Sequence, residues 1–323
     1  MIERRSLLTM AGLAAAAQAA PARAQGQWPD RPIRLIVGFP AGGPTDFAAR
    51  LLQEPLQGLW GQPIVIENRA GASQNIAAEF VARSTPDGYT LFLSTSAHTT
   101  NPAVFARITW DPVRDFTPIA IIYSAPTVLF VGRTQPYRTV RDIVEAAKRD
   151  PGMAAATSGI ATSGHFATAD FGRVAGIELT VVPYRGAPPA LQDVVGGRIP
   201  ITFSTLSGAI GLAREGQLRP IAIAAARRTP LFPDVPTMEE AGFPIRDTSP
   251  WYSFMAPAGL PDAIVQRIAN DTIGLLRRPE IIKRIEDAGG FVVAEGPEAF
   301  RARIPREVAE NQATARAFNI KVE

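Results

Sequence analysis

The sequence predicts an α/β protein built from two lobes, and three observations lead to this prediction. The chain has 323 residues, enough for two domains of about 100–200 residues each. Short apolar runs alternate with longer amphipathic segments, as in α/β units on a mostly parallel sheet. A loop of small residues that leads from a strand into a helix occurs twice, once in each half of the chain.

The first half of the chain supplies the elements of one such unit. An apolar strand is expected at 33–37, followed by a Gly/Pro loop and a helix at about 45–59. The other expected elements are a strand at 63–67, a helix at 74–84 and, after the turn Pro86-Asp87-Gly88, a strand at 89–94.

The second half begins where an apolar stretch at 119–131 is interrupted by Ser124-Ala125-Pro126. The helices expected after it cover 140–149, 164–175 and 189–196, and the strands cover 154–157, 180–183, 199–204 and 220–225. After a Pro-rich turn region at 232–243 the sequence predicts an extended segment at 248–257, helices at 262–276 and 279–288, a strand near 291–293 and a last helix at 297–317.

Residues 1–24 have the layout of a secretory signal. Arg4 and Arg5 precede an apolar stretch at 7–20, and the small-residue site Ala22-Arg23-Ala24 predicts cleavage before Gln25. The Ala-rich stretch and the arginine pair favour the twin-arginine export route, and a Sec signal with a chance arginine pair is the alternative. Either route exports the chain, which is then expected in the periplasm of a Gram-negative cell.

Composition argues against several classes of function. Residues 1–24 hold three arginines and one glutamate, so the net charge of +3 falls to +1 without them, and no nucleic-acid binding is expected. The chain has no cysteine and only two histidines, which leaves no thiolate or His-rich metal site. The phosphate-loop, zinc-helix and nucleophile-elbow patterns are missing. No cofactor, metal or catalytic residue is therefore predicted.

The two small-residue loops, 38–46 and 158–164, are the first candidates for a binding site. Each precedes an expected helix, and the unpaired N–H groups and positive dipole end of a helix N-terminus bind anions without a basic side chain. Neither loop contains Arg or Lys. Facing each other across a cleft, the loops predict a site for a carboxylate, or for a dicarboxylate that fills both. The alternative for either loop alone is a tight turn of the kind common in α/β folds.

Two further polar clusters follow expected strands, at 94–102 and 204–207, where open α/β sheets place ligands; a solvated loop is the alternative for the first. Asp46 either favours its helix through the dipole or has a role in binding, in which it orders waters or pairs with a ligand ammonium. The predicted ligand-binding residues are Phe39, Ala41, Gly42, Gly43, Thr45, Asp46, Ser94, Ser96, Ser158, Gly159, Thr162, Ser163, His165 and Ser204.

A hydrolase is the rival from another class, because His165 lies near Ser163 and Asp170 in the sequence. A histidine in the first turn of a helix is more often a capping or core residue than a member of a catalytic triad. We therefore expect a binding protein and no enzyme.

Seven motifs resemble the substrate-binding proteins of tripartite tricarboxylate transporters, also called the Bug or TctC-like family. The resemblance runs in order along the whole mature chain, which makes it highly specific. The motifs are WPDRPIRLIV at 28–37 with FPAGGPTD at 39–46, VIENRAGA at 65–72, TPDGYTL at 85–91, DPVRDFTP at 111–118, VPYRG at 182–186, LFPDVPT at 231–237 and APAG at 256–259.

This resemblance implies a two-lobed periplasmic-binding-protein fold of the Venus-flytrap, type II-like kind, with crossing hinge strands. Lobe 1 would comprise 25–125 plus 250–323, and lobe 2 would comprise 126–249. It also implies capture of a small carboxylate for an inner-membrane permease of two components, with sensing for a two-component system as the alternative. We expect a monomer.

The chain departs from the family pattern at two places. Ser73-Gln74 stands where the family commonly has Gly-Gly, and Pro200 stands where an acidic residue is common. The second departure makes an amino-acid ligand less expected, and the apolar Ile160-Ala161 pair suggests a bulkier or partly apolar carboxylate.

Overall fold

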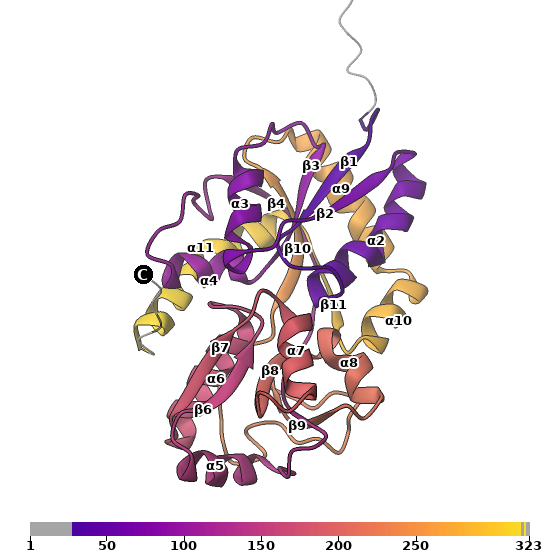
Figure 1. Ribbon diagram of the computed structural model, residues 1–323. Coiled ribbons are helices and arrows are strands. Elements are labelled where there is room, and N and C mark those ends of the chain that lie inside the picture. The colour runs from indigo at the N-terminus through magenta and orange to yellow at the C-terminus, as the bar shows by residue number, and fades with distance from the viewer. Residues whose placement is uncertain (1–27, 318–319, 321–323) are drawn as a thin grey trace, which may run out of the picture.

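Two β-sheets form the centres of two lobes in the computed structural model, which describes residues 28–317 and 320 (Figure 1). The predicted signal, 1–24, lies outside the described residues. Lobe 1 holds a six-stranded sheet of order β11-β4-β10-β3-β1-β2, with β1 Ile33–Val37, β2 Ile64–Asn68, β3 Thr90–Thr95, β4 Phe116–Ser124, β10 Trp251–Pro257 and β11 Phe291–Glu295. Lobe 2 holds a five-stranded sheet of order β7-β6-β8-β5-β9, with β5 Thr127–Gly132, β6 Met153–Thr157, β7 Leu179–Pro183, β8 Ile201–Thr205 and β9 Leu218–Ala224.

The expectation of mostly parallel sheets is wrong. β1 pairs in parallel with β2 and β3, and β6 pairs in parallel with β7 and β8. All other pairings include β4, β5 or β10 and are antiparallel. A βαβ crossover joins two neighbouring strands in the parallel direction. A strand that returns from the other lobe has no such connection to its neighbour, so it can pair with it in the antiparallel direction.

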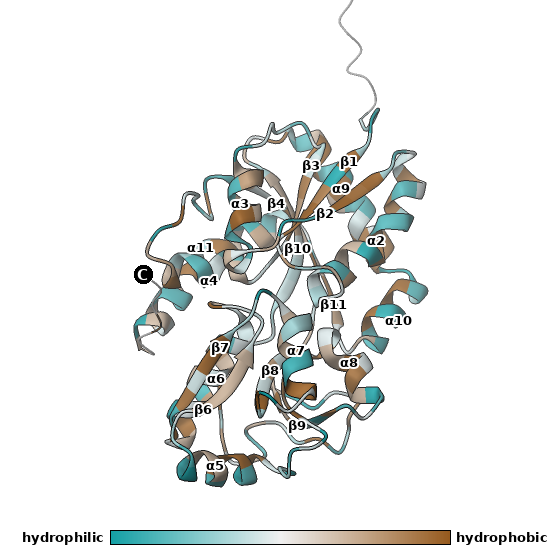
Figure 2. Ribbon diagram, viewed as in Figure 1, coloured by the Kyte–Doolittle hydropathy of each residue, from teal (hydrophilic) through white to brown (hydrophobic). Residues whose placement is uncertain are grey.

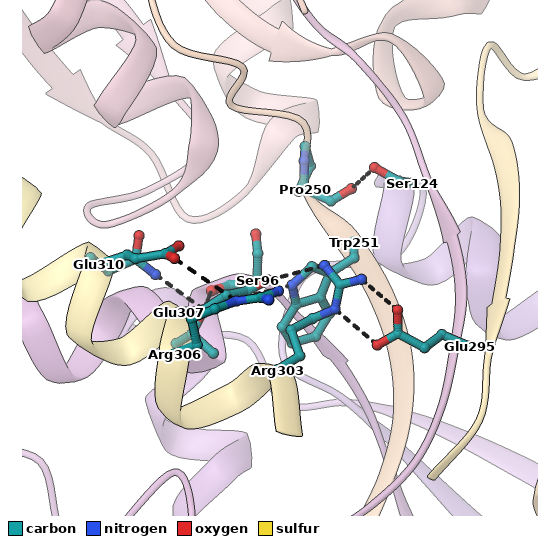
Figure 3. Close-up of polar contacts among 11 residues, drawn as sticks. Ser96, Ser124, Pro250, Trp251, Glu295, Arg303, Arg306, Glu307 and Glu310 are labelled. Carbon is teal, nitrogen blue, oxygen red and sulfur yellow. Dashed lines mark hydrogen bonds and ion pairs between the residues drawn. The ribbon is translucent and has the colours of Figure 1, made fainter. Parts of the chain in front are cut away.

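The chain crosses between the lobes twice, and the crossings lie side by side. Only Ala125 and Pro126 separate β4 from β5, and residues 225–250 lead from β9 back to β10. Ser124 Oγ donates a hydrogen bond to the carbonyl oxygen of Pro250 over 2.9 Å (Figure 3). These adjacent crossings support our proposal that the lobes divide at 125/126 and 249/250.

Helices cover both faces of each sheet and present apolar stripes to it. In α2, for example, the buried Ala48, Leu51, Leu52 and Leu56 recur at helical spacing among polar residues (Figure 2). The helices of lobe 1 are α2 Pro44–Trp60, α3 Asn75–Ala82, α4 Ala97–Val104, α9 Asp262–Leu276, α10 Pro279–Asp287 and α11 Pro297–Ala317, with a short 3₁₀ turn at Ala72–Gln74. Those of lobe 2 are α5 Val140–Arg149, α6 Ser163–Ala175, α7 Ala187–Val195 and α8 Leu206–Arg214. Among these described helices, none is long and apolar enough to cross a membrane.

Sequence reasoning missed two helices, α4 and α8. The first is short and polar with Pro102 inside it, and the second contains Gly208 and Gly211. The helix α4 lacks the apolar periodicity that predicts a helix. In α8 the apolar Leu206, Ala209 and Ala213 do recur at helical spacing, but the two glycines weaken the helix signal. Tertiary contacts stabilise α4, which packs against the C-terminal helix α11.

Candidate functional site

A cleft between the lobes is lined by loops and helix starts from both of them. Its lining residues are Phe39, Pro40, Gly43, Pro44, Thr45, Thr95, Ser96, Ala97, Ser158, Thr162, Ser163, Ala187, Pro188, Thr205, Pro250 and Tyr252. The space between these residues, counted out to the open mouth, is about 450 Å³. None of these lining residues carries a charge.

Five helices begin at this cleft: α2 and α4 of lobe 1, and α6, α7 and α8 of lobe 2. In none of the five does the N-cap side chain bond its own helix, although at α4 the N–H of Ala97 donates to Thr95 Oγ1 over 3.2 Å. A helix start carries about half a positive charge and leaves its first N–H groups without intrahelical acceptors. At α7, however, Pro188 and Pro189 have no N–H, and at α8 the N–H of Leu206 donates to the carbonyl of Pro126 over 2.9 Å. Together the five helix starts make the cleft attractive to an anion although it has no cationic side chain.

The start of α2 shows how one of these ends is kept open. The N–H of Phe47 donates the first intrahelical hydrogen bond, to the carbonyl of Gly43 over 3.0 Å. The N–H groups of Thr45 and Asp46 lie before it and have no intrahelical acceptor. Pro44 has no N–H to satisfy. Gly42 has a φ of +79°, a conformation that favours glycine and lets the loop turn back toward the helix.

Asp46 supports this loop and does not line the cleft. Its carboxylate accepts hydrogen bonds from Gly42 N–H over 3.0 Å, Arg50 Nε over 2.7 Å and Asn68 Nδ2 over 3.4 Å. Burial raises the pKa of Asp46, but the bonds from Arg50, Gly42 and Asn68 outweigh it and leave the pKa below its usual value. The structure thus favours the role of Asp46 at its helix start over direct contact with a ligand.

The start of α6 is open for a similar reason. The N-cap residue Thr162 donates its hydroxyl to the carbonyl of Gly159 over 2.7 Å, so that hydroxyl is held in the loop and not on its own helix. Phe166 donates the first intrahelical bond, to Thr162. The N–H groups of Ser163, Gly164 and His165 therefore have no intrahelical acceptor at this end of the cleft.

His165 stabilises the loop that precedes α6. Its Nδ1 accepts a hydrogen bond from Ala161 N–H over 3.1 Å, and Ala161 has a positive φ of 60°. Burial lowers the pKa of His165 to about 4, so the ring is neutral at pH 7. The catalytic alternative finds no support here, because Asp170 accepts hydrogen bonds from Arg173 and from the Arg246 N–H, and within 28–317 no hydrogen bond joins His165 to Ser163.

The two crossing strands of lobe 1 supply the base of the cleft. Tyr252 of β10 stacks on Tyr123 of β4 with ring centroids 4.5 Å apart. The Tyr123 hydroxyl donates to the carbonyl of Pro44 over 3.1 Å and lies 3.4 Å from Ser207 Oγ, which brings β4, α2 and α8 together. Burial raises the pKa of Tyr252 to about 12, so its hydroxyl stays a neutral donor.

The start of α4 is anchored to α11 through one carboxylate. Glu307 Oε2 accepts hydrogen bonds from Trp251 Nε1 and from Thr99 Oγ1, both over 3.0 Å, and Arg303 pairs with Glu307 Oε1 over 3.3 Å (Figure 3). Ser96 lies beside this network and donates its N–H to the carbonyl of Trp251 over 3.1 Å. The network fixes the α4 N-terminus against the hinge strand β10.

Seven of the fourteen residues predicted from the sequence line this cleft, and seven do not. Those in the lining are Phe39, Gly43, Thr45, Ser96, Ser158, Thr162 and Ser163. Gly159 lines an adjoining cavity, Ala41 and Gly42 are exposed on the loop, and Asp46 and His165 brace the loops. Ser94 is buried against Gln74 Nε2, and Ser204 points away from its neighbour Thr205, because successive strand residues face opposite sides.

The lining residues that sequence reasoning missed are Pro40, Pro44, Thr95, Ala97, Ala187, Pro188, Thr205, Pro250 and Tyr252. Thr205 lies inside a polar cluster that had been noted, so its position as an N-cap could have been read once α8 was recognised. Tyr252 carries no such signal, because an apolar strand alone does not indicate that it forms the base of a cleft.

Comparisons with known proteins agree on one family. The pattern of the family described as "Tripartite tricarboxylate transporter family receptor" matches residues 48–317. BugT of Bordetella pertussis is 33% identical over 307 residues, which cover 94% of each chain. A solved structure of an R. palustris protein with adipate is 34% identical with a TM-score of 0.88, and it covers 91% of this chain and 100% of its own.

MatC from Rhodopseudomonas palustris, solved with bound malate, is 30% identical with a TM-score of 0.84 over 89% of this chain and 99% of its own. The agreement over nearly the whole length confirms the two-lobed α/β fold predicted from the sequence.

Proposed function

Because this chain belongs to the tripartite tricarboxylate transporter receptor family, we propose that it captures a small carboxylate in the periplasm. It holds the ligand between its lobes and delivers it, chemically unchanged, to an inner-membrane permease of two components. In this role it acts as an exported monomer that is cleaved near Ala24, and it needs no cofactor, metal or nucleic acid. The solved relatives that carry adipate and malate support a carboxylate as the ligand class.

One observation carries this proposal: five helix N-termini converge on a cleft whose lining residues have no charge, and those of α2 and α6 keep N–H groups without intrahelical acceptors. A carboxylate accepts hydrogen bonds only, so it satisfies the N–H groups and the hydroxyls of Thr45, Ser158 and Ser163 together. A neutral solute can accept some of these hydrogen bonds but gains less from the dipoles than an anion does, and a cation is repelled by them.

Closure of the lobes supplies the selectivity of capture. The carboxylate contacts lobe 1 at the starts of α2 and α4 and lobe 2 at those of α6, α7 and α8. A ligand stabilises the closed form only by the contacts that it makes there and not in the open form. Because charge-assisted hydrogen bonds contribute about 1.5–3 kcal/mol each, four or five of them support micromolar affinity after the cost of ordering.

Isothermal titration calorimetry with succinate, malate, glutarate and adipate, each paired with its diamide, tests the proposal at pH 7. We expect at least one acid to bind with micromolar affinity and its diamide to bind at least a hundredfold more weakly, because the diamide keeps the shape and loses the charge. Equal affinity for acid and diamide, or binding of neutral compounds alone, would sink the proposal.

Recovery of the bound compound separates binding from turnover. After overnight incubation with excess ligand, mass spectrometry should return the same acid in full. Hydrolysis of a panel of esters that disappears in Ser163→Ala would favour the hydrolase instead.

A further inference from the structure

A second cavity adjoins the cleft and continues it away from the hinge strands. The two share Phe39 and Ser158, and the second has an empty volume of about 520 Å³, counted out to its mouth. Much of its wall is apolar, with Phe39, Ala72, Phe105 and Ile160 among the lining residues. A ligand that holds its first carboxylate at the helix starts and passes between Phe39 and Ser158 would place an apolar chain against this wall.

Arg185 is the only charged residue among those that line either cavity. It lies at the corner between β7 and α7, and the backbone on both sides is held. Tyr184 donates its N–H to the carbonyl of Thr157 over 2.9 Å, and its hydroxyl donates to Asp193 over 2.5 Å. The corner therefore presents Arg185 at a defined place on the cavity wall.

On the C-terminal side of Arg185, the corner packs against lobe 1. Gly186 has a φ of +130°, and a Cβ on it would meet Pro40 Cδ at 2.6 Å. Pro40 belongs to the α2 loop of lobe 1, so the corner reaches its partner loop only when the lobes are closed. Arg185 is thus brought to the ligand by the same motion that completes the first carboxylate site.

The Arg185 side chain is exposed, and no ion pair or hydrogen bond joins it to another residue of 28–317 or 320. The nearby acid Asp193 is already taken, because Arg198 and Tyr184 both bind it. The guanidinium group consequently retains its planar set of N–H donors, which matches a carboxylate in two-pronged fashion.

We propose that Arg185 binds the second carboxylate of a linear dicarboxylate whose apolar spacer lies in the adjoining cavity. This inference rests on the proposed function, since it places the first carboxylate at the helix N-termini. The two ends of the ligand are thus bound differently. Backbone N–H groups bind the first carboxylate, and the side chain of Arg185 binds the second.

Calorimetry with matched ligands tests this assignment. Succinate, glutarate and adipate are each compared with the corresponding monoamide, which keeps the first carboxylate and the length and loses the second charge. The proteins are the wild type, Arg185→Gln, Arg185→Lys and the control Arg149→Gln, which removes an exposed positive charge at the end of α5. Thermal unfolding followed by circular dichroism checks that each variant is folded.

For the diacid that binds most tightly, we expect Arg185→Gln to raise its Kd about tenfold and to leave the Kd of its monoamide unchanged. Arg185→Lys should restore part of the difference, because an ammonium keeps the charge but not the fork, and Arg149→Gln should behave as the wild type. Equal effects of Arg185→Gln on diacid and monoamide, or no effect on either, would overturn the inference alone. If the wild type binds neither a diacid nor a monoamide, the proposed function fails with it.

Discussion

The hydroxyl of Thr100 donates a hydrogen bond to the carbonyl oxygen of Ala161 over 2.6 Å, and this bond joins α4 of lobe 1 to the loop that precedes α6 of lobe 2. One residue earlier in that loop, the carbonyl of Ile160 accepts a hydrogen bond from Ser73 Oγ over 2.5 Å. Both bonds span the lobes, so they stabilise the closed form and are lost when the cleft opens.

We therefore predict that Thr100→Val weakens ligand binding without unfolding the protein. Valine keeps the shape and removes one closed-form hydrogen bond of about 1 kcal/mol, which shifts the open–closed equilibrium about fivefold and raises the Kd by about the same factor. Calorimetry gives the Kd. Thr180→Val, at an exposed position of β7, is the matched control and should leave the Kd unchanged. An unchanged Kd in Thr100→Val would show that the bond does not contribute to closure.

Ser163→Asp should separate stability from binding. Position 163 opens α6, where a carboxylate interacts favourably with the helix dipole by about 0.3–1 kcal/mol, so we expect the melting temperature to hold or rise. The same charge repels a carboxylate ligand from the cleft, and we expect a loss of affinity of more than a hundredfold. Ser163→Ala, which removes only the hydroxyl, should lose no more than about tenfold. Retained affinity in Ser163→Asp would contradict an anion site at this helix start.

Gly164→Ala should destabilise the fold although alanine is the better helix former. A Cβ at this position would meet the carbonyl oxygen of Phe203 at 2.3 Å, so α6 must move away from β8. We expect a loss of about 1–3 kcal/mol in the free energy of unfolding in urea. Gly211→Ala in α8 has open space around its Cβ and should gain up to about 1 kcal/mol. A gain for both variants would refute the close approach.

Acid should destabilise the protein in part through His165. Burial lowers its pKa to about 4 in the folded protein, whereas the unfolded value is about 6.5. Between these values the unfolded chain binds a proton that the native ring does not, so the free energy of unfolding falls as the pH falls, by up to about 1.4 kcal/mol per pH unit. His165→Gln keeps an acceptor for Ala161 N–H and removes this titration. Urea unfolding at pH 7, 6, 5 and 4.5 should show a shallower fall for the variant, and parallel curves would contradict the assignment.

Local sequence signals identified the elements that have strong local causes. The starts of α2 and α6 follow from a strand that runs into a small-residue loop, and the crossing at Ala125-Pro126 follows from an interrupted apolar run. The helix α4 has no comparable signal and depends on packing against α11, whereas α8 has apolar residues at helical spacing but contains two glycines, which disfavour a helix. Their absence from the prediction hid two of the five helix starts that meet at the cleft.

Side-chain roles were harder to predict than elements. Asp46 and His165 have the chemistry of ligand-binding groups, but in the fold each is bonded to the loop that it supports. Arg185 stands in the motif VPYRG, which by itself indicates no role for it, whereas the structure places it on a cavity wall without an ion-pair partner among the described residues.

The amino-acid sequence by itself determined the alternation of strands and helices, the division into two α/β halves and two small-residue loops without basic residues, because hydrophobic periodicity and loop chemistry act between near neighbours. The tertiary structure alone decided that five helix N-termini share one cleft, that five of the nine strand pairings are antiparallel and that Tyr252 forms the base of the cleft. These features depend on contacts between residues far apart in the chain, whose geometry is set by the packing of both lobes together.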